Sequence, residues 1–283
     1  MTKILKRVRA PVRIDFAGGT TDIKPFTDTN GGAVLNGAIN HYVYGELIAT
    51  DKSTKLEYHA DIPTSSGLGT SSAMNDVWVA LITHLKDKKK IAEDVFNIEH
   101  AVAESAVNGK QDMYAAVYGG INYMEFIGDK VLVHPLDLKQ KIIKELENKL
   151  VLVYSGIGHL SGSSNKAAID NLLKGKNTDE LVRLKEIAGE MKNALLKGDL
   201  YMFANLMNKE TQERKKLSKI TVSPKLQNII DLGVKNGAIA AKVCGSGGGG
   251  SILFFTEDKK KLVNKFKGRV IDFKFDFEGL KWM

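Results

Sequence analysis

A loop rich in glycine and hydroxyl side chains lies between Pro63 and Ala73, with the sequence Pro-Thr-Ser-Ser-Gly-Leu-Gly-Thr-Ser-Ser-Ala. In the segment that follows, Val77, Leu81 and Leu85 recur every fourth position, which predicts an amphipathic helix. A loop that opens a helix presents unpaired backbone N–H groups and the positive end of the helix dipole, and both favour phosphate. A helix-capping serine would account for only one hydroxyl residue, so the length of the run favours an anion-binding loop.

This loop differs from the common nucleotide fingerprints. The sequence contains no Gly-x-x-x-x-Gly-Lys-Ser/Thr motif, because Gly109-Lys110 and Gly175-Lys176 are followed by glutamine and asparagine. The glycine spacing also departs from the dinucleotide-binding motif, and no clean βαβ unit encloses the loop. A phosphate site here would therefore depend on helix dipole, backbone amides and Mg²⁺ rather than on a P-loop lysine.

Glycine also marks two other segments. In the first, an apolar stretch that contains Arg13 runs into Gly18-Gly19 and ends at Asp22. In the second, Cys244 precedes Gly-Ser-Gly-Gly-Gly-Gly, and a short apolar stretch follows. Glycine lets the backbone turn sharply or approach a ligand closely. Taken alone, the first segment is more typical of an ordinary strand and turn, and the glycine run of the second is also typical of a flexible turn.

Carboxylates that could serve phosphoryl transfer lie between these segments. Asp112 follows Gly-Lys-Gln and could orient or deprotonate an attacking hydroxyl. Glu99 or Glu104, on a predicted helix just before it, could share a Mg²⁺ with the hydroxyl-rich loop, since Mg²⁺ takes few protein oxygens and keeps water and phosphate as its other ligands. A solvated surface charge is the alternative for each of these acids.

The expected elements mix strands and helices without strict βαβ alternation, which favours an α+β fold. Short β-branched or aromatic stretches predict strands at 43–48, 55–62, 131–134, 151–154, 251–255 and 270–277. Apolar periodicity predicts helices at 72–85, 91–106, 138–148, 178–196, 200–217 and 224–236. A division near residue 150 would give domains 1–150 and 151–283.

Bulk properties narrow the class of protein. The net charge of +8, from 41 basic and 33 acidic residues in 283, suits an anionic ligand. The lysine runs at 86–90 and 259–261 resemble solvated helix ends rather than a nucleic-acid surface, because no aromatic residues interleave them. One cysteine permits no internal disulfide, and no apolar run reaches transmembrane length or resembles a secretory signal. We expect a cytoplasmic protein without membrane or nucleic-acid partners.

Taken together, the three glycine-bearing segments resemble the motifs of the GHMP kinase superfamily, in the family's order. The stretch from Pro63 to Ala73 is similar to its phosphate-binding motif, with Thr70 as one extra residue. Within the superfamily, Phe-Ala-Gly-Gly-Thr-Thr-Asp at 16–22, Gly-Gly-Ala-Val-Leu at 31–35 and Gly-Lys-Gln-Asp-Met-Tyr-Ala-Ala at 109–116 resemble sugar kinases of the D-glycero-D-manno-heptose 7-phosphate kinase type.

The resemblance implies a site for ATP and Mg²⁺. Nucleotide-binding positions would be Pro63, Ser65, Ser66, Gly67, Leu68, Gly69, Thr70, Ser71 and Ser72. The metal ligands would be Ser71 and Glu99, with Glu104 as the alternative to Glu99. Asp112 would orient or deprotonate the acceptor hydroxyl, and Arg13 would stabilise the transferring charge.

The resemblance also implies an acceptor site. Its positions would be Gly18, Gly19, Thr20 and Asp22, with Gly245, Gly247 and Gly248 shaping it. Further candidates for its lining are Tyr154, Ser155, Gly156 and His159. A phosphate on the acceptor could meet Lys24, Lys110 or Lys166.

The implied fold has two α+β lobes, an N-terminal lobe like ribosomal protein S5 domain 2 and a ferredoxin-like C-terminal lobe, with ATP and acceptor between them. The implied activity is phosphorylation of a hydroxyl, most often the anomeric C1 hydroxyl, of a sugar or sugar-phosphate by a monomer or homodimer. The alternatives are a mevalonate- or galactose-type kinase of the same fold, a non-catalytic ATP and sugar sensor, and a basic nucleic-acid binder.

Overall fold

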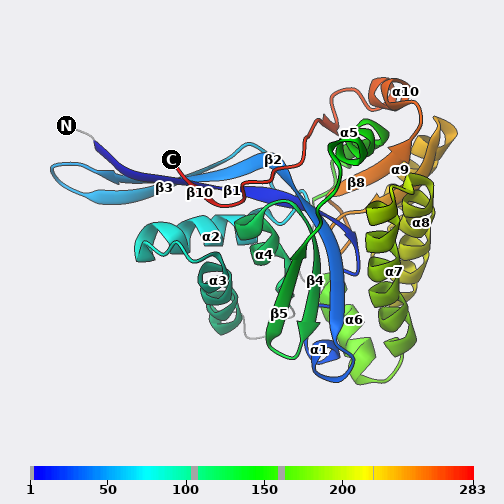
Figure 1. The fold of residues 1–283 in the computed structure, drawn as a ribbon, viewed down its shortest axis with the longest axis horizontal. Helices are drawn as coiled ribbons and strands as arrows, with labels where there is room; N and C mark the ends of the chain where they lie inside the picture. Colours follow the sequence, from blue (N-terminus) through cyan, green and yellow to red (C-terminus); the bar gives the residue numbers. More distant parts are fainter. Residues whose placement is uncertain (1–2, 103–107, 159–162, 219) are drawn as a thin grey trace.

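Two antiparallel sheets organise the chain in a computed structural model that describes residues 3–102, 108–158, 163–218 and 220–283. The larger sheet has the order β10-β1-β2-β4-β5, and β3 pairs with the far part of β2 (Figure 1). Its strands are β1 (Lys3–Ala17), β2 (Gly32–Ala49), β3 (Thr54–Ala60), β4 (Ile121–Ile127), β5 (Lys130–Pro135) and β10 (Lys281–Trp282). The smaller sheet has the order β7-β8-β6-β9. Its strands are β6 (Leu150–Tyr154), β7 (Ala238–Val243), β8 (Ser251–Thr256) and β9 (Val270–Ile271).

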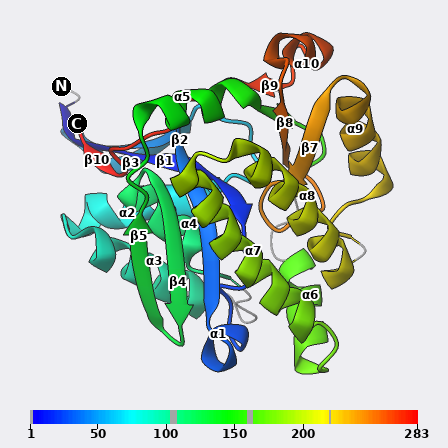
Figure 2. The same cartoon turned by 45° about the vertical axis from the view of Figure 1, so that its right-hand side comes forward.

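Helices cover the larger sheet on both sides near its middle. In both views α2, α3 and α4 lie on one side, and α7 and the adjacent, antiparallel α8 lie on the other (Figures 1 and 2). The burial of β2 is consistent with this arrangement. Residues 32–39 are buried without alternation, as in a strand covered on both faces, whereas only some side chains of residues 43–49 are buried. The helices are α1 (Phe26–Thr29), α2 (Thr70–Thr83), α3 (Lys88–Val102), α4 (Gln111–Tyr118), α5 (Gln140–Lys149), α6 (Ser163–Leu173), α7 (Thr178–Lys197), α8 (Leu200–Leu217), α9 (Pro224–Lys235) and α10 (Lys259–Lys265).

One hydrophobic core joins elements from both halves of the sequence. Phe16 of β1 packs edge-on against Phe203 of α8 and against Phe275, with ring centroids 5.4 and 6.1 Å away. The smaller sheet and α9 enclose a second cluster around Phe254. The second sheet begins with β6 at Leu150, while β10 returns to the first sheet. The domain boundary near residue 150 stays a prediction.

The predicted α+β class is confirmed, since every strand pairing among the described residues is antiparallel. Five of the six predicted strands and all six predicted helices are present, although the last positions of the helix expected at 91–106 lie outside the described residues. The strand predicted at 270–277 is wrong beyond Ile271. Phe273 and Phe275 do point alternately into the core, but an isolated bridge to Ile39 is the only ladder pairing there among described residues.

Several elements were not predicted: α1, α4, α6, α10, β4, β7 and β10. Within the described ranges, no helix combines the length and the apolarity that crossing a bilayer requires.

Candidate active site

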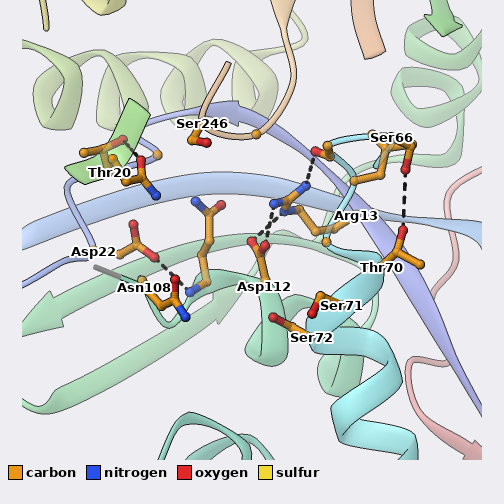
Figure 3. A pocket seen from close by; sticks show the side chains of 18 of the residues that line it. Arg13, Thr20, Asp22, Ser66, Thr70, Ser71, Ser72, Asn108, Asp112 and Ser246 are labelled. Carbon is orange, nitrogen blue, oxygen red and sulfur yellow. Dashed lines mark hydrogen bonds and ion pairs between the residues drawn. The ribbon is translucent and has the colours of Figure 1, made fainter. Parts of the chain in front are cut away.

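A cavity of about 410 Å³ lies where the three glycine-bearing segments meet the start of α4 and the side of α8 (Figure 3). Most of the site residues predicted from the sequence line it. They are Arg13, Gly19, Thr20, Asp22, Ser65, Ser66, Gly67, Leu68, Gly69, Thr70, Ser71, Ser72, Glu99, Asp112 and Gly245. In the view of Figure 3, Asp112 lies between the Asp22 side of the cavity and the hydroxyl-rich start of α2.

The hydroxyl-rich loop turns into α2 through glycine. Gly67 and Gly69 have φ of +73° and +75°, in the left-handed region that glycine enters without strain. Gly69 occupies the N-cap of α2, and no side chain caps that helix end. The capping-serine alternative is therefore wrong, and the first-turn N–H groups of α2 are left without a side-chain cap where Thr70, Ser71 and Ser72 border the cavity.

The third glycine segment packs directly on this loop. The Ser251 N–H donates to the Ser66 carbonyl at 2.8 Å. A Cβ added to Gly250 would lie 2.6 Å from that carbonyl oxygen, and one added to Gly245 would lie 2.8 Å from the Gly67 carbonyl oxygen. The glycines of this segment thus let two backbones touch, which explains why one loop supports the other.

Arg13 and Asp112 form a two-pronged ion pair at the centre of the cavity. Arg13 Nε donates to Asp112 Oδ1 at 2.8 Å and Arg13 Nη2 to Oδ2 at 2.6 Å, while Nη1 donates to the Gly67 carbonyl at 2.9 Å. Burial opposes the charge on Arg13, but the carboxylates of Asp112 and Asp15 outweigh it and raise its pKa. Arg13 therefore stays charged and holds Asp112 beside the hydroxyl-rich loop.

Asp22 is a second carboxylate in the cavity, and it is 5% exposed. Its Oδ2 accepts the backbone N–H of Gln111 at 3.0 Å. The Asp22 carboxylate lies so close to Gly109 that a Cβ added to this glycine would be 1.8 Å from Asp22 Oδ2. Burial raises the pKa of Asp22 from 3.8 to about 6, and the nearby charge of Asp112 adds to the rise.

Glu99 reaches the cavity from α3. Its Oε1 accepts from Asn75 Nδ2 at 2.8 Å and from Ser72 Oγ at 3.3 Å, and burial raises its pKa. Ser71 and Glu99 offer the hard oxygen donors that Mg²⁺ prefers. The described residues hold no group of three His, Cys, Asp or Glu side chains placed for an ion, so a metal here would complete its shell with nucleotide and water oxygens. Glu104, the alternative ligand, lies outside the described residues.

Asp76 of α2 is fully buried, and neither of its carboxylate oxygens has a hydrogen-bond partner among the described residues. Burial raises its pKa well above the usual value, and the charges of Glu99 and Asp112 add to that effect. Nothing in the sequence distinguishes Asp76 from an exposed helix carboxylate.

A buried ionic cluster supports the other end of the cavity. It contains Asp15, Glu210, Arg214 and Lys242, each 3% exposed or less. Lys242 Nζ donates to Asp15 Oδ2 at 2.9 Å, and the Gly245 N–H donates to Asp15 Oδ1 at 2.8 Å. Burial alone would raise the pKa of Asp15, but Lys242 and Arg214 hold it below the usual value. The cluster thus ties the first and third glycine segments together.

Some lining residues were missed by sequence reasoning: Thr64, Met74, Asn108, Gly109, Gln111, Asn165, Arg214 and Ser246. Gly109 and Gln111 flank a predicted catalytic residue, and that proximity could have identified them. Arg214 adjoins Lys215 and Lys216 in the sequence, where it looks like part of a solvated helix end.

Other predicted positions are not part of the described lining: Pro63, Gly18, Gly247, Gly248, Tyr154, Ser155, Gly156, Lys24, Lys110 and Lys166. Lys24 and Lys110 both pair with Asp129. The Gly248 N–H donates to the Thr221 carbonyl at 2.8 Å, and the Ser155 N–H to the Gly250 carbonyl at 2.9 Å, so these residues brace the third glycine segment. His159 lies outside the described residues.

Comparisons with known proteins agree with this geometry. The chain matches the family model of the GHMP kinases N terminal domain over residues 34–120 and that of GHMP kinases C terminal over residues 191–269. It is 29% identical to D-glycero-alpha-D-manno-heptose 7-phosphate kinase of Campylobacter jejuni, in an alignment covering 97% of this chain and 98% of that protein. It is 27% identical to the mevalonate kinase of Methanocaldococcus jannaschii over 73% of this chain and 63% of that protein.

Solved structures share the whole fold. The crystal structure of a D-glycero-D-manno-heptose 1-phosphate kinase from Bacteroides thetaiotaomicron superposes with a TM-score of 0.76 at 28% identity, covering 99% of each chain. The L. major mevalonate kinase superposes with a TM-score of 0.71 at 15% identity, covering 96% of this chain and 98% of that one, which supports the fold alone. The predicted two-lobed α+β kinase fold is confirmed, and with both family domains matched in order, this chain belongs to the GHMP kinase family.

Proposed function

We propose that this protein transfers the γ-phosphate of ATP to the anomeric C1 hydroxyl of a sugar-phosphate such as D-glycero-D-manno-heptose 7-phosphate. The observation that carries the proposal is the cavity in which the uncapped start of α2 faces the Arg13–Asp112 pair. One side of that cavity suits phosphate and the other suits hydroxyl groups. The heptose kinase relative, aligned over nearly the whole of both chains, supports the choice of acceptor.

The nucleotide side rests on backbone groups. The loop from Ser65 to Gly69 and the first turn of α2 would bind the ATP phosphates through N–H groups and the helix dipole. Ser71 and Glu99 would hold Mg²⁺, which supplies charge neutralisation to the phosphates when bound. No lysine from the described residues lines the cavity, so these groups carry the electrostatic work together with Arg13.

The transfer step depends chiefly on alignment. Asp112 would accept a hydrogen bond from the attacking hydroxyl and take its proton as the new P–O bond forms. Its two hydrogen bonds to Arg13 fix the direction of the carboxylate. A loose phosphoryl-transfer transition state needs little assistance from a strong base, so a well-held carboxylate suffices.

A substrate panel tests the proposal. Purified protein with Mg·ATP would be assayed for ADP release with D-glycero-D-manno-heptose 7-phosphate, galactose and mevalonate, and the product position would be read by ³¹P NMR. We expect turnover of the heptose phosphate with a product phosphorylated at C1. Turnover of mevalonate or galactose alone would favour the alternative kinase types, and ATP binding without any turnover would favour a sensor.

The use of ATP as co-substrate indicates the cellular compartment and the kind of partner. A kinase that uses metabolic ATP would work in the cytoplasm with small-molecule partners, as a monomer or homodimer. Light scattering of the purified protein would decide between these two states.

A further inference from the structure

Arg214 is a buried cation that borders the cavity and is not used in the transfer step. It lies on α8, is 3% exposed, and with Arg13 supplies the cationic side chains that the described residues give to the lining. Arg13 is committed to Asp112. Arg214 is thus available for a different part of the substrates.

The surroundings of Arg214 fix its guanidinium and leave one nitrogen, Nη1, unused. Nε and Nη2 lie 2.8 and 2.7 Å from Glu210 Oε1, and Nη2 also donates to the Gly19 carbonyl at 3.1 Å. No hydrogen bond within the described ranges uses Nη1. A Cβ added to Gly19 would lie 2.9 Å from Arg214 Nη2, so the glycine is what lets the guanidinium reach the first glycine segment.

A neutral donor lies on the same side of the cavity. Asn165 of α6 lines it, and its Oδ1 accepts from Thr20 Oγ1 at 3.0 Å. This bond orients the amide and leaves Nδ2 without a partner among the described residues. Thr20 and Ser246 lie together at this end in Figure 3, away from Thr70 and Ser71.

We propose that Arg214 and Asn165 form the subsite for the phosphate that the acceptor already carries, which rests on the proposed sugar-phosphate kinase function. A fixed guanidinium nitrogen and an amide donor that line the same cavity can both donate to a phosphate monoester. Asp22 repels an anion and instead suits neutral hydroxyl groups, so the sugar chain lies along Asp22 with its anionic end at Arg214. The reacting hydroxyl then reaches Asp112, and the two ends of the acceptor are held apart.

This arrangement also revises which cations meet the acceptor phosphate. The sequence suggested Lys24, Lys110 or Lys166. None of these three lysines is part of the described lining, and Lys24 and Lys110 pair with Asp129, whereas Arg214 borders the cavity.

The test compares specificity constants for two probes, D-glycero-D-manno-heptose 7-phosphate and unphosphorylated D-glycero-D-manno-heptose. We expect the wild type to favour the phosphorylated probe. In Arg214→Gln the ratio of the two kcat/KM values should fall about tenfold to a hundredfold, as expected for loss of a charged hydrogen bond. Lys242 Nζ lies 3.5 Å from Glu210 Oε1 and still offsets that carboxylate in the variant.

Asn165→Asp keeps the test informative should Arg214→Gln fail to fold, because Asn165 is partly exposed. The new carboxylate should lower the same ratio at least tenfold through repulsion of the phosphate. Lys216→Gln on the same helix is the matched control, since Lys216 pairs with Glu213 away from the cavity. An unchanged ratio in both subsite variants would overturn the inference while the proposed function stands. A wild type that phosphorylates no sugar would defeat the proposed function, and this inference with it.

Discussion

The carboxylate of Asp22 should make the stability of the fold depend on pH. Burial raises its pKa from 3.8 to about 6. Each pH unit of such a shift corresponds to about 1.36 kcal/mol, so the shift of roughly two units corresponds to about 3 kcal/mol. Asp22 is 5% exposed, so solvent screens this term little.

The sign follows from the direction of the shift. The folded protein binds the Asp22 proton more tightly than the unfolded chain does, so this stabilising term is present in full below the unfolded pKa near 3.8. It is lost as the pH rises toward the folded value of about 6. Asn at this position keeps an oxygen acceptor for the Gln111 N–H but has no proton to lose. The unfolding free energy of Asp22→Asn, relative to that of the wild type, should therefore rise by about 3 kcal/mol as the pH increases across this window.

Urea unfolding followed by circular dichroism, at several pH values between about 4 and 7.5, would measure the difference in unfolding free energy between the two proteins. Asp28→Asn is the matched control, because Asp28 is exposed and makes only a long pairing to Lys24. A difference between wild type and Asp22→Asn that stays constant with pH would refute the reasoning. An unfolding free energy that rises more in the wild type than in the variant as the pH increases would also refute it.

Three other substitutions test separate parts of the site. Asp112→Asn should lower kcat by about a hundredfold to ten-thousandfold while a fluorescent ATP analogue still binds; full activity would remove Asp112 from the transfer step. Gly250→Ala should destabilise the fold by about 1–3 kcal/mol more than the control Gly268→Ala. Both glycines have positive φ, but only a Cβ at Gly250 would meet a backbone carbonyl. Equal melting temperatures of the two variants would show that the third glycine segment and the hydroxyl-rich loop do not need this contact. Asp76→Val should raise the unfolding free energy by about 1–3 kcal/mol, and with it the urea midpoint. A lower midpoint would mean that the carboxylate has a stabilising partner.

Periodicity in the sequence predicted the long elements well, because a helix such as α7 buries one stripe of side chains. It failed where side chains are buried alternately, as in a strand, but the backbone does not pair as a strand. Phe273 and Phe275 alternate into the core as strand residues do, yet the backbone beside them does not form a regular ladder. The Lys274 N–H donates to Asn40 Oδ1 at 2.7 Å and the Phe275 N–H to Glu147 Oε1 at 3.0 Å, which takes two amides out of strand pairing. Alternation reports which side chains are buried, and hydrogen-bond partners depend on the neighbouring segments.

The local motifs predicted the hydroxyl-rich loop as part of the cavity lining, but they did not predict Arg214 or Asn165. The loop before α2 carries its chemistry in consecutive residues, so one stretch of sequence reveals it. Arg214 and Asn165 are ordinary helix residues until α6 and α8 are packed against the first glycine segment. Their placement depends on tertiary contacts such as the bond of Arg214 to the Gly19 carbonyl, which no local pattern encodes.

The pairing of β10 with β1 bears on how the chain is synthesised. Val8 lies opposite Trp282, so β1 acquires this neighbour only after almost the whole sequence has left the ribosome. Until then the outer edge of β1 in the nascent chain presents unpaired amide and carbonyl groups, which are prone to pair with other chains. Truncation before Lys281 should leave that edge open permanently and make the shortened protein prone to aggregate.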